Sequence, residues 1–131
     1  MEGFNNVKIL LVDDTSVLRK ILKILLVSEF GASGDNVYEA GNGDEAVQIY
    51  KEKAPDIVLL DIAMPGKNGI DTLKEIIEID PNAYVVMCTS SSEEEAEVAS
   101  KTAGAKSYLA KPPNTERLQQ IFTDLLQNKA K

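Results

Sequence analysis

The sequence predicts an α/β domain in which helices cover both faces of one parallel β-sheet. Apolar runs of strand length alternate with stretches of helical period along the chain. The run at residues 57–60 is apolar on both faces, as expected of a central strand. Connections between parallel strands are right-handed, which places helices on both sides of the sheet.

The first predicted strand, residues 8–12, is a short apolar run. Thr15 or Ser16, both favourable N-cap residues, begins a helix expected to reach about Glu29, with Gly31 as its C-cap. The buried stripe predicted for this helix consists of Leu18, Ile21, Leu22, Leu25 and Leu26.

A polar turn at residues 34–36 leads to a short second strand at residues 37–40. Asp44 is expected to begin the second helix, and Pro55 closes that region. The inward residues predicted for this helix are Ala46, Val47 and Tyr50. The third strand, residues 57–60, follows directly.

The third helix is predicted at residues 70–79, with Leu73, Ile76 and Ile77 inward. It follows a glycine-containing loop at residues 64–69 and precedes a fourth strand at residues 84–88. Ser92 is expected to begin a fourth helix, because serines followed three residues later by glutamates form capping boxes.

The fifth strand is predicted at residues 107–110 and the last helix begins after Asn114 or Thr115. The stripe expected on that helix is Leu118, Ile121, Phe122, Leu125 and Leu126, and residues 128–131 are expected to fray. The whole chain, residues 1–131, is interpreted as one domain with a core at about residues 7–127.

Composition excludes several classes of function. A formal net charge of −7 disfavours nucleic acid and anionic membranes as partners. No apolar stretch is long enough to span a membrane, and we expect a cytoplasmic protein. With no histidine and only Cys88 as a thiol, histidine catalysis and a zinc site are disfavoured.

Reactive side chains gather at the carboxyl ends of the predicted strands. Asp13 and Asp14 follow the first strand, Asp61 the third, Thr89 the fourth and Lys111 the fifth. Because parallel strands end at a common edge, and ligands bind beyond that edge, we expect these residues to form one site.

Three acids at one edge repel one another, by about 4 kcal/mol for a pair 4 Å apart at an effective dielectric near 20. A divalent cation would offset that charge, and oxygen ligands suit Mg²⁺. Asp61 could then attack a phosphoryl group, while Lys111 and Thr89 neutralise and bind its oxygens. The sequence therefore predicts a magnesium-dependent aspartyl-phosphate site.

The chain resembles a response-regulator receiver domain over essentially its whole length. The matching segments are Leu11-Val12-Asp13-Asp14, Leu60-Asp61-Ile62-Ala63-Met64-Pro65 with Gly69, Val86-Met87-Cys88-Thr89, and residues 103–112. The resemblance implies the flavodoxin-like (CheY-like) doubly wound fold, with strand order 2-1-3-4-5.

The resemblance also implies residue roles. Asp61 is the phosphoacceptor, Asp14 a direct Mg²⁺ ligand and Asp13 a ligand through water. Ala63 supplies a backbone carbonyl to the metal. Lys111 binds the phosphoryl group, Thr89 is the switch hydroxyl and Tyr108 the aromatic that moves with it.

We expect a phosphorylation switch rather than an enzyme acting on a separate substrate. The implied partners are a sensor histidine kinase or phosphotransfer protein and a downstream protein, bound through the helix 4–strand 5–helix 5 face. A chemotaxis role is the nearest analogy. The expected state is a monomer, with phosphorylation-dependent dimerisation left open.

Several alternatives stay open at this point. The chain could serve as a phosphorelay intermediate or as the detached receiver of a hybrid kinase. An aspartyl phosphatase is disfavoured because Ala63 stands where such enzymes carry an acid, and flavin binding because Asp13 and Asp14 would repel a phosphate. A docking module without phosphorylation is a further alternative. Ala63 and Ser91 are small where family members often carry larger polar groups, which leaves the lifetime of the phosphorylated form undetermined, and Pro113 stands where an aromatic residue is common.

Overall fold

Five parallel strands form one sheet in the order β2-β1-β3-β4-β5, which confirms the predicted fold. The strands are β1 (Ile9–Val12), β2 (Val37–Ala40), β3 (Ile57–Asp61), β4 (Val85–Thr89) and β5 (Ser107–Ala110). The structure is a computed structural model, and it describes residues 6–62, 64, 66, 68–89, 101, 103–110 and 115–129. The predicted fourth helix from Ser92 lies outside these residues.

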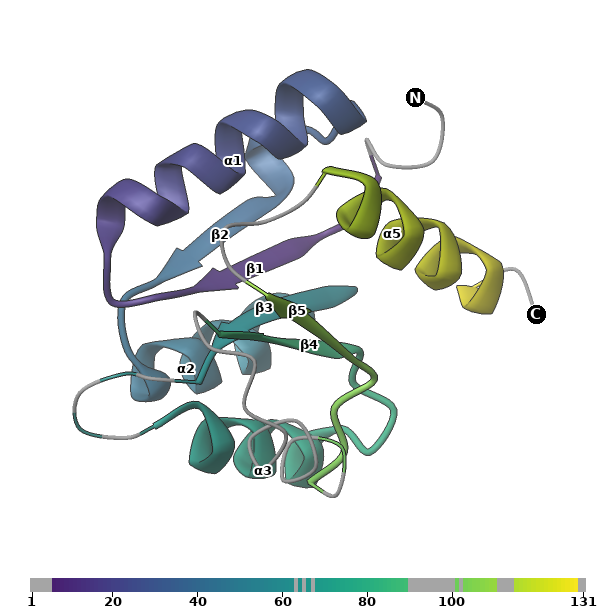
Figure 1. Cartoon of the computed structure of the whole chain (residues 1–131). Helices are drawn as coiled ribbons and strands as arrows, with labels where there is room; N and C mark the ends of the chain where they lie inside the picture. Colours follow the sequence, from purple (N-terminus) through teal and green to yellow (C-terminus); the bar gives the residue numbers. More distant parts are fainter. Residues whose placement is uncertain are drawn as a thin grey trace.

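Helices lie on both faces of the sheet (Figure 1). Helices α1 (Ser16–Phe30) and α5 (Thr115–Lys129) cover one face, and α2 (Gly43–Lys53) and α3 (Gly69–Ile79) cover the other. A short 3-10 turn, Gly34–Asn36, precedes β2 where the polar turn was predicted. None of the helices in the described part of the chain has the length and apolar character of a membrane span.

The central strand β3 is buried along its whole length, as its sequence predicts. Strands β1 and β4 flank it, with Val12 opposite Leu60 and Cys88 opposite Asp61. Alternate residues of β1 and β3 face the two apolar clusters, one under α1 and α5 and the other under α2 and α3. The sheet is therefore packed on both faces, and this packing sets the position of its carboxyl edge.

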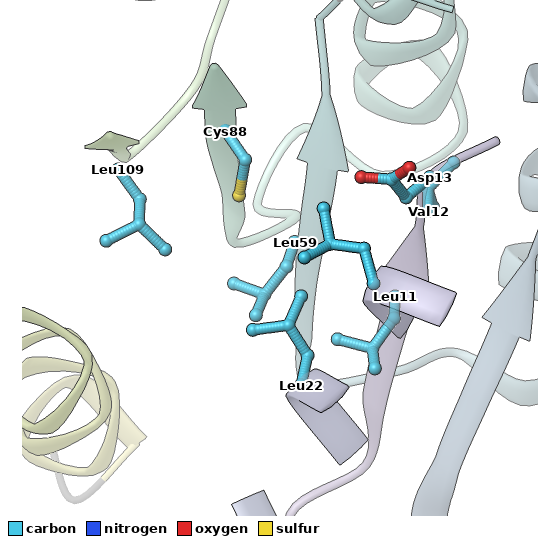
Figure 2. A pocket seen from close by; sticks show the side chains of 8 residues that line it. Leu11, Val12, Asp13, Leu22, Leu59, Cys88 and Leu109 are labelled. Carbon is cyan, nitrogen blue, oxygen red and sulfur yellow. The ribbon is translucent and has the colours of Figure 1, made fainter. Parts of the chain in front are cut away.

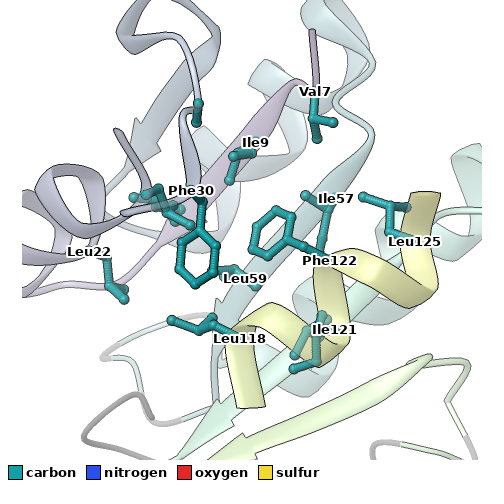
Figure 3. Close-up of a cluster of buried hydrophobic side chains, with 14 of the residues drawn as sticks. Val7, Ile9, Leu22, Phe30, Ile57, Leu59, Leu118, Ile121, Phe122 and Leu125 are labelled. Carbon is teal, nitrogen blue, oxygen red and sulfur yellow. The ribbon is translucent and has the colours of Figure 1, made fainter. Parts of the chain in front are cut away.

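The core under α1 and α5 contains a pair of aromatic rings (Figure 3). Phe30 of α1 and Phe122 of α5 have ring centroids 6.0 Å apart, and both side chains are at most 2% exposed. Leu118, Ile121 and Leu125 of α5 pack in the same cluster, as predicted. The two helices of this face are therefore joined through their aromatic side chains as well as through the sheet.

The predicted stripe of α1 was partly wrong. The buried row is Leu22, Leu26 and Phe30, while Ile21 is 52% exposed. Residues four apart form one row along a helix, and the row that faces the sheet runs through these positions, so that Ile21 lies off it. The prediction also ended α1 one residue early, before Phe30.

Other boundaries differ from the predictions by one or two residues. Helix α2 begins at Gly43 because the side chain of Asn42 caps it, accepting from the Glu45 N–H at 2.8 Å. Helix α3 begins at Gly69 because Asn68 caps it in the same way. Strand β3 includes Asp61, β4 is shifted by one residue towards Thr89, and α5 continues to Lys129 through part of the segment expected to fray.

Candidate functional site

The acids of the site are brought together by the register of β1 and β3. Val12 lies opposite Leu60, so the next residues, Asp13 and Asp61, lie side by side at the carboxyl edge. One carboxylate oxygen from each of Asp13, Asp14 and Asp61 lies within 4.8 Å of the others. Asp13 and Asp61 are 4% and 5% exposed, whereas Asp14 is exposed to solvent.

Asp13 is held by several hydrogen bonds. Its backbone N–H donates to the Ala40 carbonyl of β2 at 3.1 Å, and its Oδ1 accepts from the Thr15 N–H at 2.8 Å. Its own carbonyl accepts from Arg19 Nη1. Thr15 was predicted as an N-cap and occupies that position, but its side chain makes no capping bond to α1. The turn is instead stabilised by the carboxylate of Asp13.

Asp61 is positioned by a close backbone approach. The Ile62 N–H donates to the Cys88 carbonyl at 3.0 Å, and the Gly69 N–H donates to the Ile62 carbonyl at 2.9 Å. A Cβ atom on Gly69 would lie 2.2 Å from the Asp61 carbonyl oxygen and 2.7 Å from the Ile62 Cα. Only glycine permits this approach, so the start of α3 packs directly against the end of β3.

A cavity lies on the α1 side of the sheet, below Asp13 (Figure 2). Leu11, Leu59, Cys88 and Leu109 line it from neighbouring strands, and Leu22 of α1 faces them. Its volume of about 10 Å³ is at the lower limit of what one water molecule needs. Asp13 borders the cavity and most of its other lining residues are leucines, so the polar chemistry of this edge lies in the acid cluster.

The other predicted site residues are placed less completely. Thr89 ends β4, where its backbone lies opposite Ala110 of β5 and one residue beyond the level of Asp61. Its side chain, Ala63 and Lys111 lie outside what the structure describes. Tyr108 lies on β5, half-buried against the cluster under α2 and α3. The roles of these residues stay predictions.

The three carboxylates fit a magnesium ion by the chemistry of their donors. All are oxygen ligands, and Mg²⁺ binds oxygen at about 2.0–2.1 Å, so two oxygens on one ion lie at most about 4.2 Å apart. The observed separation of up to 4.8 Å is slightly wider. Mg²⁺ usually keeps several waters, so these acids would hold the ion together with water.

Sequence reasoning missed two contributors to this edge, Arg19 and Glu39. Arg19 of α1 donates through Nε to Glu39 of β2 at 3.1 Å, in addition to its contact with the Asp13 carbonyl. Glu39 on its short strand and Arg19 one turn into its helix do not belong to any hydrophobic pattern in the sequence. Only the packing of α1 against β2 reveals that they meet.

The family model for the response regulator receiver domain matches residues 9–123. The chain belongs to this family. Receiver domains act as phosphoacceptor switches and bind Mg²⁺ at an acidic pocket, which in this receiver corresponds to the cluster of Asp13, Asp14 and Asp61. CheY-like receivers interact with kinases and with downstream targets.

Curated relatives and a solved structure agree with this assignment. The receiver is 40% identical to the chemotaxis protein CheY of Halobacterium salinarum over 91% of this chain and 96% of that protein. It is 41% identical to CheY of Thermotoga maritima over 88% and 93% of the two chains. It also resembles a chain in the CheX–CheY–BeF3–Mg²⁺ complex from Borrelia burgdorferi, with 30% identity, a TM-score of 0.79 and coverage of 92% and 89%.

Proposed function

We propose that this receiver is a signalling switch that accepts a phosphoryl group on Asp61 in the presence of Mg²⁺. The observation that carries the proposal is the convergence of three carboxylates from two strands within 4.8 Å at the carboxyl edge of the sheet. Two of them are almost completely buried, which is costly for ionised groups without a compensating positive charge. A bound cation offsets that charge.

In the proposed reaction, an oxygen of the Asp61 carboxylate attacks the phosphorus of a phosphohistidine on the donor protein. The new O–P bond forms as the P–N bond breaks, and the imidazole leaves with the bonding electrons and takes up a proton. Magnesium, when bound, neutralises charge on the phosphoryl oxygens. Asp13 and Asp14 would hold the metal, and Asp61 would supply both a ligand and the nucleophile.

Thr89 and Lys111 are the proposed phosphoryl-binding residues. The register supports this role, because the backbone of Thr89 lies one residue past Asp61 on the neighbouring strand and Lys111 follows Ala110 on the next. The hydroxyl and the ammonium would bind phosphoryl oxygens that the metal does not contact. The carbonyl of Ala63 would complete the metal's ligands.

The output of the switch is proposed to pass through protein contact on the helix 4–strand 5–helix 5 face. Arg117 of α5 donates to the Ser107 hydroxyl at 2.8 Å and to the Tyr108 carbonyl at 3.2 Å, so β5 and α5 are joined next to Tyr108. A movement of Tyr108 would therefore change the contacts that Arg117 of α5 makes with β5. The CheY names of its relatives favour chemotaxis as the pathway.

The proposal is tested by incubating the protein with a small-molecule phosphodonor and measuring its intact mass. We expect one added phosphoryl group with Mg²⁺ and none in the presence of a metal chelator. Asp61→Asn is expected to stay unmodified, while the matched control Asp56→Asn, at the opposite end of β3, is modified like the wild type. Steady turnover of phosphomonoesters would instead favour the phosphatase alternative.

A further inference from the structure

We propose that Arg19 is a positioning residue for the acid cluster, acting through the backbone of Asp13. The inference rests on the proposed function where it concerns Mg²⁺. Arg19 Nη1 donates to the carbonyl of Asp13, and its Nε donates to Glu39 of β2 at 3.1 Å. One guanidinium thus links α1, the end of β1 and the edge strand β2.

The atom that Arg19 binds matters for the site. The carbonyl of Asp13 belongs to the peptide group that joins Asp13 to Asp14, and both of these acids belong to the cluster. The orientation of this peptide plane sets the direction in which the Asp14 side chain leaves the backbone. The N–H and Oδ1 of Asp13 are bound by Ala40 and Thr15, and Arg19 binds its carbonyl, so both backbone polar groups of the residue are held.

Apolar packing of the first turns of α1 is limited to part of the helix surface, chiefly half-buried Leu18. Val17 and Ile21, in the first half of α1, are 63% and 52% exposed, and the buried residues of the helix begin at Leu22. The small cavity lies between this half of α1 and the strands, with Leu18 and Leu22 in its wall. The contacts of Arg19 add polar links between the first turns of α1 and the strands β1 and β2.

Glu39 anchors the guanidinium from the other side. The side chains of Arg19 and Glu39 are 15% and 29% exposed, so the pair is better shielded from solvent than a surface ion pair. The turn after β2 also lies near the guanidinium, since a Cβ atom on Gly41 would be 3.6 Å from Arg19 Nη1, an ordinary contact distance. Arg19 is thus held in one orientation, as a positioning role requires.

Positioning and charge have opposite effects on a bound cation. If Arg19 acts only as a nearby positive charge, its removal makes the cluster more negative and strengthens Mg²⁺ binding. If Arg19 positions the Asp13–Asp14 peptide, its removal weakens Mg²⁺ binding. The expected loss is about tenfold, which is typical when a residue that orients metal ligands is removed. The sign of the change in affinity separates the two roles.

The test is isothermal titration of Mg²⁺ into the metal-free protein. We expect Arg19→Met to weaken Mg²⁺ binding about tenfold, Glu39→Gln to weaken it less, and Arg19→Lys to restore part of the loss. Lys20→Met is the matched control, because the exposed neighbouring lysine carries the same charge without these contacts. Unchanged or tighter binding in Arg19→Met would overturn the inference.

Hydrogen exchange in the metal-free protein provides a readout that does not depend on the proposed function. Arg19→Met is expected to speed exchange of the Asp13 and Thr15 amides, while the Leu59 amide at the centre of β3 is unaffected. Equal acceleration at all three positions would indicate a general loss of stability and contradict a positioning role. A wild-type protein that binds no Mg²⁺ would overturn the proposed function, and the exchange data would still decide whether Arg19 fixes this turn.

Discussion

Removing one charge from the acid cluster should make the metal-free protein more stable. Asp13→Asn is the best perturbation, because asparagine retains the oxygen that accepts from the Thr15 N–H at 2.8 Å. Two carboxylate oxygens within 4.8 Å of each other repel by about 3.5 kcal/mol or more at an effective dielectric of 20. Solvent at the exposed Asp14 and nearby positive charges reduce this value, and we expect a net gain of about 1–2 kcal/mol.

The assay is thermal unfolding followed by circular dichroism, with a chelator and with Mg²⁺. In chelator, Asp13→Asn should raise the midpoint by roughly 3–8 °C for a domain of this size. With Mg²⁺ at about 100 times its dissociation constant, the wild type should gain about 2.7 kcal/mol and the variant much less, so the order reverses.

Asp35→Asn is the control for this experiment. Asp35 is exposed in the 3-10 turn before β2, at the opposite end of that strand from the acids. Its change in stability should stay within about 0.5 kcal/mol in both conditions. A lower midpoint for Asp13→Asn in chelator would refute the argument that unrelieved repulsion exists among the three acids.

Further predictions concern the framework around the site. Gly69→Ala should destabilise the fold by about 1–3 kcal/mol, because its Cβ would meet the Asp61 carbonyl oxygen at 2.2 Å; Gly34→Ala, whose nearest neighbour would be 4.0 Å away, should change the urea midpoint little. Phe122→Ala should cost about 3–5 kcal/mol in denaturant unfolding, since it leaves a cavity beside Phe30, and Phe122→Leu should cost clearly less. Burial, reinforced by the hydrogen bond to Asp80, raises the pKa of Tyr50 well above its ordinary value of 10.0. The unfolded chain therefore loses this proton first, and the contribution of Tyr50 to stability is complete below about pH 10 and declines as the pH rises further. Tyr50→Phe should flatten the decline of unfolding free energy measured above pH 10, and an unchanged slope would contradict this assignment.

Much of the fold could be predicted because strands and helices carry separate periodicities. The central strand β3 is apolar on both faces, and its placement follows from that pattern alone. Asp13 and Asp61 could be expected to meet, because parallel strands share an edge. Helix boundaries were less accurate where Asn42 and Asn68 act as caps, because the helices they cap begin one residue before the expected starts.

The parts that sequence reasoning missed depend on contacts between distant segments. Ile21 fits a helical stripe but is exposed, because the packing of α1 selects the row through Leu22, Leu26 and Phe30. Nothing in the local sequence indicates that Arg19 contacts both Asp13 and Glu39. Glu39 lies twenty residues further along the chain. Such contacts follow from the angle at which a helix crosses the sheet, which periodicity does not fix.

The most direct measurement identifies the residue that carries the phosphoryl group. Borohydride reduces an acyl phosphate to an alcohol, so a phosphorylated aspartate becomes homoserine, which peptide mass spectrometry locates. After reaction with a phosphodonor and Mg²⁺, we predict homoserine at position 61 alone, with Asp13 and Asp14 recovered intact. Homoserine at position 13 or 14, or its absence from a protein that has bound the metal, would contradict the account.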